Sequence, residues 1–199
     1  MLDVYSPCPC GSGKSFKFCC HQSYKKGDFE QIIKRASSLP IYECKAVDKW
    51  EETGMTPVTV VRSLNQEIYT LLSYLIDSWC LGLKDVLIKI GMSKFELLQY
   101  YKMASQDQPL VSISYQDARS VILGAIDYAK NLGFEPHYDW KKVELFVEGN
   151  QPYENKFSFG KDGKPFYFAG PYDSNNYNIE DIFVKVTAAG GHCISPLID

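Results

Sequence analysis

The sequence lacks any long apolar run that is free of charge. Its longest apolar stretch, residues 68–90, is interrupted by Asp77, Lys84 and Asp85, and charges in the middle of a membrane span are costly. The N-terminal residues also lack the apolar run that a secretory signal needs. These absences argue against a membrane span and a secreted protein, and they predict a cytoplasmic one.

A strong excess of charge of one sign is missing too. The 199 residues carry 21 lysines and arginines against 24 acidic residues, which gives a net charge of −3. A protein that binds nucleic acid through the phosphate backbone usually shows a strong positive field, so the charge disfavours RNA binding, although a local lysine patch would be enough for it. Hydrophobic residues make up 45% of the chain, which fits one globular domain with a small additional module.

What the sequence does contain is a cluster of cysteines near its start. Four of the seven cysteines fall within thirteen residues, at Cys8, Cys10, Cys19 and Cys20. Disulfides are not expected in a reducing compartment, whereas four thiolates suit the tetrahedral coordination of zinc. Residues 11–13, Gly-Ser-Gly, give the backbone freedom that the loop between the two cysteine pairs needs in order to turn back.

These four thiolates predict a closed metal site with no open position for water, which makes the metal structural rather than catalytic. Cys20 is the favoured fourth ligand, and the adjacent His21 is the alternative. Iron also accepts four sulfur ligands, so the spacing by itself leaves zinc and iron open.

The segment CPCGSGKSFKFCCH, residues 8–21, resembles the SEC-C motif, named after the C-terminal tail of the translocation ATPase SecA. The resemblance implies a zinc-binding interaction module over residues 1–26, with a protein or a ribosome-like ribonucleoprotein as its partner. Lys14, Phe16 and Lys17 are the residues expected to contact that partner. The boundary to the domain of residues 27–199 is expected at Lys25-Lys26-Gly27.

Beyond this boundary the pattern predicts an α+β domain with two antiparallel hairpins and several helices. The hairpins are expected over 57–64 with 67–77, and over 156–160 with 164–170. Helices are expected over 28–38, 43–53, 80–91, 93–104, 114–132, 139–148 and 177–188. A short strand is expected at the sequence HCIS, and the phenylalanines of the second hairpin are expected on one face.

Three further phrases resemble an uncharacterised bacterial domain found behind SEC-C knuckles. They are SWCLGLKD (78–85), YAKNLGFEPHYDW (128–140) and FGKDGKPFYFAGPYDS (159–174). This resemblance covers about residues 40–199. It implies an architecture and no reaction.

Polar residues inside apolar segments are the weak candidates for catalysis: Asp77, Cys80, Lys84, Asp85 and His137. A carboxylate or thiol at a strand end beside a histidine would support a hydrolase or a nuclease-like enzyme. Several of them also have a structural interpretation. Asp77 would cap the expected 80–91 helix, and Lys84 and Asp85, if they are buried, would be paired or hydrogen-bonded, as in a structural ion pair. The sequence therefore favours a zinc-binding adaptor, with an enzyme and an RNA-binding factor as the alternatives.

Overall fold

The computed structural model describes residue 5 and residues 13–18, 29–64, 66–170 and 173–194. At its centre lies an antiparallel sheet of five strands in the order β4-β3-β2-β1-β5. The strands are β1 Ile41–Val47, β2 Met55–Ser63, β3 Ile68–Asp77, β4 Gly82–Ser93 and β5 Leu110–Ile113. The predicted α+β class is confirmed for the described part of the chain. The hairpin of β2 and β3 lies where the sequence predicts it.

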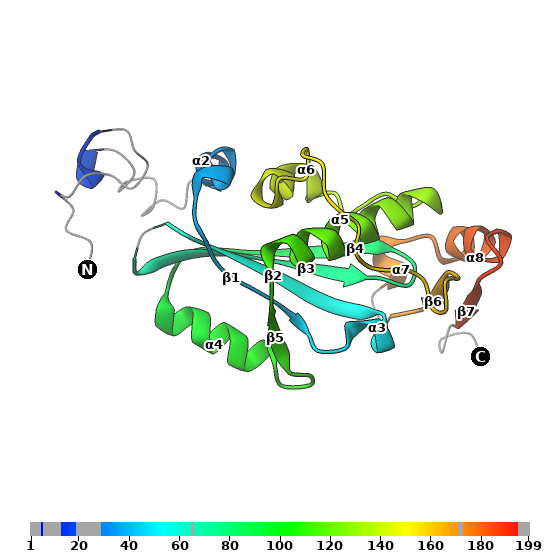
Figure 1. The fold of residues 1–199 in the computed structure, drawn as a ribbon. Coiled ribbons are helices and arrows are strands. Elements are labelled where there is room, and N and C mark those ends of the chain that lie inside the picture. The colour runs from blue at the N-terminus through cyan, green and yellow to red at the C-terminus, as the bar shows by residue number, and fades with distance from the viewer. Residues whose placement is uncertain (1–4, 6–12, 19–28, 65, 171–172, 195–199) are drawn as a thin grey trace.

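Helices cover both faces of the sheet (Figure 1). One face carries α2 Phe29–Lys34, α5 Tyr115–Asn131 and α6 Trp140–Val143, while α4 Lys94–Ala104 packs on the other. The other helical segments are η1 Phe16–Phe18, η2 Ala36–Ser38, α3 Trp50–Thr53, η3 Glu144–Val147, α7 Asp173–Asn176 and α8 Ile179–Ala188. None of the helices in the described part of the chain combines the length and the apolar character that crossing a bilayer requires.

The helices predicted over 93–104 and 114–132 are confirmed, and each begins at a capping serine. Ser93 and Glu96 form a complete capping box at the start of α4, and the Ser114 side chain accepts a hydrogen bond from the Asp117 amide at the start of α5. The predicted apolar stripe of α5 is buried against the sheet, at Ala118, Val121, Ile122, Ala125, Ile126 and Ala129. Local signals of this kind need no distant partner, which is why the sequence reveals them.

The predicted helix over 80–91 is wrong, because this segment forms the outer strand β4. It pairs antiparallel with β3 along most of its length. Val86 is buried while Asp85 and Leu87 on either side are exposed, an alternation with the period of two that a strand shows. A short apolar run fits both helix and strand patterns, and here pairing with β3 decides between them.

The predicted helix over 43–53 is also wrong over most of its length. Its first half belongs to β1, which lies between β2 and β5, and only Trp50–Thr53 is helical. Gly54 ends that helix in a left-handed conformation with φ of 75°, as predicted. Pairing on both sides of β1 overrides the weak local preference of the segment. Strand β5 has only four residues and was not predicted at all.

The second predicted hairpin forms its turn but not its ladder. Asp162 and Gly163 both have positive φ, and one antiparallel bridge joins Lys161 to Lys164. The chain then leaves this pairing, and β6 Phe166–Phe168 instead runs parallel to β7 His192–Ile194. Pro165 lacks the N–H that would continue an antiparallel ladder. The phenylalanines do not share one face, since Phe159 is buried and Phe168 is exposed.

The helix predicted over 139–148 is divided into α6 and η3, and the strand predicted at HCIS is confirmed as β7. The last predicted helix is confirmed as α8, which Asn178 caps.

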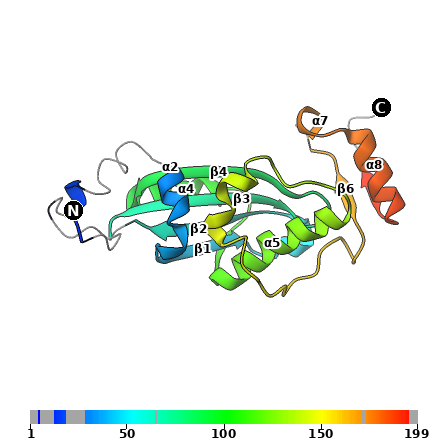
Figure 2. The ribbon, with the colours of Figure 1, turned by 90° about the horizontal axis from the view of Figure 1, so that it is seen from above.

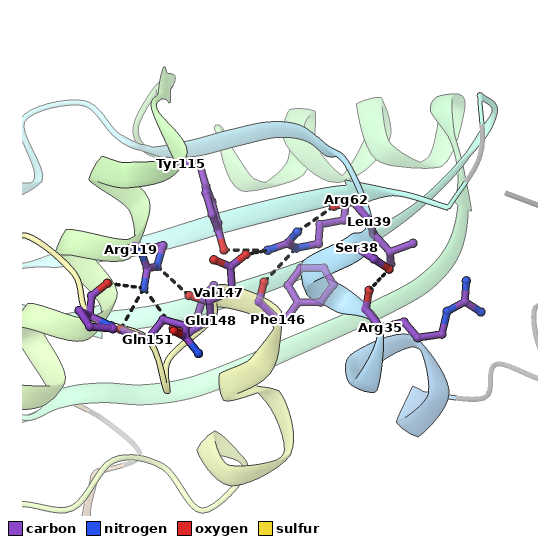
Figure 3. A network of polar contacts seen from close by, with 11 residues as sticks. Arg35, Ser38, Leu39, Arg62, Tyr115, Arg119, Phe146, Val147, Glu148 and Gln151 are labelled. Carbon is purple, nitrogen blue, oxygen red and sulfur yellow. Dashed lines mark hydrogen bonds and ion pairs between the residues drawn. The ribbon is translucent and has the colours of Figure 1, made fainter. Parts of the chain in front are cut away.

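A buried arginine on β2 joins three separate parts of the chain to the sheet (Figure 3). The Arg62 side chain is only 2% exposed. It donates to the carbonyl oxygens of Leu39 (2.8 Å) and Phe146 (2.9 Å), to the Tyr115 hydroxyl (2.7 Å) and to the Glu148 carboxylate (3.1 Å). Its guanidinium also lies over the rings of Tyr115 and Phe146. One side chain therefore holds the segments around η2, α5 and η3 in place.

Candidate functional site

The predicted metal ligands lie outside the residues that the structure describes. They are Cys8, Cys10, Cys19, Cys20 and the alternative His21. Across the described ranges, no three His, Cys, Asp or Glu side chains come together as metal ligands would. The described cysteines, Cys44, Cys80 and Cys193, are free thiols.

Between the two cysteine pairs, residues 13–18 form a tight turn. Gly13 has φ of 72°, a left-handed conformation that suits a glycine, and the Phe18 amide donates to the Ser15 carbonyl oxygen at 3.0 Å. The Lys17 ammonium donates to the Tyr5 hydroxyl at 2.9 Å and lies over the Tyr5 and Phe18 rings. The glycine of this loop thus has the turning role that the sequence predicts for it.

The turn sorts the three expected contact residues into two groups. Lys14 and Lys17 are exposed, whereas Phe16 is only 3% exposed and is therefore a packing residue. Phe18 is 72% exposed and is the aromatic ring that this turn presents to solvent. Phe16 was expected to contact the partner, but the one-turn helix η1 buries its side chain and leaves that of Phe18 exposed.

A second polar cluster lies where β4 meets the C-terminal part of the chain. The Lys84 ammonium on β4 donates to Asp173 at 2.7 Å, and these side chains are 10% and 7% exposed. The other oxygen of Asp173 accepts bonds from the Tyr167 hydroxyl (3.1 Å) and the Gly170 amide (2.9 Å). Burial raises the pKa of Asp173, but the bonds from Lys84 and Gly170 outweigh it and hold the pKa below its usual value.

The structural ion pair expected for a buried residue in this segment is present for Lys84, and its partner is Asp173. Lys84 lies at a bulge of β4, because Leu75 of β3 pairs with Asp85 while the next residue, Ile76, pairs with Leu83. Lys84 turns toward Asp173, which is 89 residues away in the sequence, while Asp85 is 65% exposed. No local sequence signal connects Lys84 with Asp173, so sequence reasoning missed this partner.

Asp77 ends β3 and closes the turn into β4. One of its carboxylate oxygens accepts bonds from the backbone amides of Trp79 (3.0 Å) and Cys80 (2.9 Å). It therefore caps a turn, whereas the sequence predicted a helix cap. Burial raises the pKa of Asp77 to about 6, against the opposing effects of these amides and of Lys84.

This raised pKa predicts a pH-dependent cost in stability. The folded protein holds the Asp77 proton more tightly than the unfolded chain does, so stability falls as pH rises from about 3.8 to about 6. Asp77→Asn keeps an oxygen acceptor and removes the buried charge, so we expect the free energy of unfolding at pH 7 to rise by about 3 kcal/mol. Urea denaturation at pH 4.5 and pH 7 measures this. A gain of equal size at both pH values would contradict the explanation, and Asp107→Asn at an exposed position is the control.

Three of the predicted catalytic candidates line one cleft of about 480 Å³: Lys84, Asp85 and His137. Asp173 lines it as well. The Nε2 atom of His137 lies 3.9 Å from the Asp85 carboxylate, which is too far for a hydrogen bond. The fourth candidate, Asp77, lines a neighbouring cleft of about 530 Å³, which also has Lys84 in its wall.

The fifth candidate, Cys80, is not part of either cleft wall. Its side chain is fully buried in an apolar cluster with Leu81 and Tyr167, and burial raises the pKa of its thiol. A buried neutral thiol is a poor nucleophile.

Comparisons with family models, with curated proteins and with solved structures find no match to this chain. Its function must therefore be argued from its own residues.

Proposed function

We propose that this chain is a cytoplasmic adaptor whose SEC-C-like segment, residues 1–26, binds zinc and contacts a protein or ribonucleoprotein partner. The ligands in this proposal are Cys8, Cys10, Cys19 and Cys20, with His21 as the alternative fourth ligand. The observation that supports it most directly is the turn of residues 13–18. That turn lies between the cysteine pairs in the sequence and exposes Lys14, Lys17 and Phe18.

The chemistry of the segment suits recognition better than catalysis. Four thiolates around zinc leave no coordination position for a substrate. Two exposed lysines and an exposed aromatic ring can contact the carboxylates of an acidic protein or the phosphates and bases of a ribonucleoprotein. The net charge of −3 disfavours naked RNA as the partner.

The polar groups of the body support the same ranking. The Lys84–Asp173 pair is buried and further bonded to Tyr167 and Gly170, so its charges are already compensated. His137 and Asp85 line a cleft without a hydrogen bond between them. A hydrolase or nuclease-like activity at this cleft therefore ranks second to the adaptor role.

The test uses four tagged full-length proteins: the wild type, Cys19→Ser, Lys14→Glu/Lys17→Glu and Lys130→Glu/Lys141→Glu. The last is the matched control, because Lys130 and Lys141 are exposed lysines of the body. We expect one zinc per chain in all but Cys19→Ser, and at least about a tenfold loss of the captured partner in Cys19→Ser and Lys14→Glu/Lys17→Glu.

Capture from lysate with and without RNase then identifies whether RNA bridges the complex. Retention of one zinc in Cys19→Ser would contradict the assigned ligands. Equal capture of the same partner by all four proteins would contradict the adaptor role of the turn.

A further inference from the structure

The outer edge of strand β4 has a stretch of backbone, unpaired with any described strand, that plays no part in the proposed function. In the sheet order β4 is an end strand, and Figure 2 shows it along one border of the sheet. Near its start the His137 amide donates to the Leu83 carbonyl oxygen at 3.0 Å, which covers the edge there. From residue 85 to residue 89 no strand of the described chain pairs with this edge.

The hydrogen bonds of the neighbouring strand show which β4 groups face outward. At the ends of the β2–β3 ladder, the Leu64 amide donates to Ile68 and the Ser78 amide donates to Gly54. Even-numbered residues of β3 therefore face β2, and odd-numbered residues face β4. Ser73 is opposite Leu87 in the β3–β4 ladder, so the backbone groups of Val86 and Ile88 point away from the sheet. The outward Val86 amide donates to the Asp85 carboxylate at 2.7 Å, which occupies it in the single chain.

The exposed side chains along residues 85–89 would be complementary in charge to those of a second, antiparallel copy of the same strand. Asp85, Leu87 and Lys89 are all exposed and alternate along the strand. In an antiparallel pairing centred on Leu87, position 85 of one strand is opposite position 89 of the other. A negative charge then faces a positive charge on each side of a central apolar pair. Within the described residues Lys89 has no ion pair, and the Asp85 carboxylate lies 3.9 Å from the Nε2 atom of His137.

We propose that β4 pairs with β4 of a second copy of this chain, antiparallel and about a twofold axis at Leu87. Val86 of each copy would exchange backbone hydrogen bonds with Ile88 of the other, because these are the outward-facing positions. The Val86 amide would give up its bond to Asp85 for this exchange, which frees the carboxylate for the second copy. Asp85 would be opposite Lys89 of the second copy, and Leu87 opposite its equivalent. The two sheets would then form one continuous sheet.

The ends of the open stretch fit this register. His137 covers the edge at Leu83, and at the other end the β3–β4 register shifts between its Lys89 and Met92 pairs, where Gly91 has φ of 72°. Such a bulge bends the strand and increases its twist, which turns the edge beyond it away from the direction of residues 85–89. The stretch that remains, residues 85–89, is centred on Leu87. Beside it lies a groove of about 660 Å³ lined by Leu87, Tyr100 and Met103, which offers apolar surface to the leucine of the second copy.

The test is sedimentation of the full chain across a concentration series, with D85K, K89D and the double variant D85K/K89D. We expect the wild type to form dimers. Each single variant places like charges opposite one another twice, so its dimer should dissociate at least about tenfold more readily. The double variant restores both opposite-charge pairs and should return to within about threefold of the wild type. Asp107→Lys, an exposed charge reversal away from β4, should leave the dimer unchanged.

A wild type that stays monomeric at all concentrations would overturn the proposal. The free edge of β4 would then be a site for pairing with an extended segment of a different protein. A dimer that both single variants leave unchanged would overturn it too, because the contact would lie elsewhere. Failure of the double variant to recover would exclude the proposed register. None of these outcomes depends on the zinc segment or on its partner, so they are separable from a failure of the adaptor proposal.

Discussion

We expect Arg62→Met to lower the free energy of unfolding by about 3–5 kcal/mol, which corresponds to a fall of about 10 °C in the thermal midpoint. Methionine fills similar space but donates no hydrogen bond. Two backbone carbonyl groups, at Leu39 and Phe146, and the Tyr115 hydroxyl would lose their partner inside the protein. Buried acceptors without a donor cost far more than the same groups in water.

Arg119→Met is the matched control for this experiment. Arg119 also donates to backbone carbonyl groups, including those of Val147 and Gln151, but it is partly exposed. Water can replace its bonds, so we expect a loss of about 1 kcal/mol. Urea denaturation followed by circular dichroism measures both variants. Equal losses in the two would show that burial of Arg62 is not the cause, and Arg62→Lys gives an intermediate value if Arg62→Met does not fold.

The second large effect is expected for Lys84→Met, at about 3–5 kcal/mol at pH 7. This change leaves the Asp173 carboxylate, 7% exposed, without its cation. Without Lys84 the pKa of Asp173 rises, and the protonated carboxyl group needs no counter-charge. We therefore expect the loss to shrink as pH is lowered from 7 to 5.

The double variant Lys84→Met/Asp173→Asn separates the ion pair from simple packing. Removing both charges avoids an uncompensated buried carboxylate, so we expect most of the lost stability to return. Thermal melts of the wild type, both single variants and the double variant form the cycle. Additive losses would contradict a direct coupling between Lys84 and Asp173.

The parts of the fold that the sequence predicts are those with local signals. The α5 stripe and the Ser93 and Ser114 caps lie within one or two turns of helix, so no distant contact is needed to recognise them. Strands β1 and β4 were assigned to helices because their short apolar runs fit both periods. Their identity comes from pairing with neighbours in the sheet. The parallel pairing of β6 with β7 joins segments that no turn signal connects.

The candidate site divides in the same way. Lys84, Asp85 and His137 were chosen from the sequence, and they do line one cleft. The pairing of Lys84 with Asp173 was not predicted, because it depends on a contact across 89 residues. The burial of Phe16 was not predicted, because it depends on a single turn of helix. The cysteine spacing stays a prediction, since the ligand residues lie outside the described part of the chain.

The strand order also implies a sequence of events during folding. The turn between β2 and β3 is closed by residues four apart, Leu64 and Ile68, whereas the contact of β1 with β5 joins Lys45 to Ser112 across 67 residues. Closing the long β1–β5 connection costs more chain entropy than closing the short β2–β3 turn, and this cost arises before the strands make stabilising contacts. The β2–β3–β4 meander therefore assembles first, and the β5 edge is the last part of the sheet to form and the first to open.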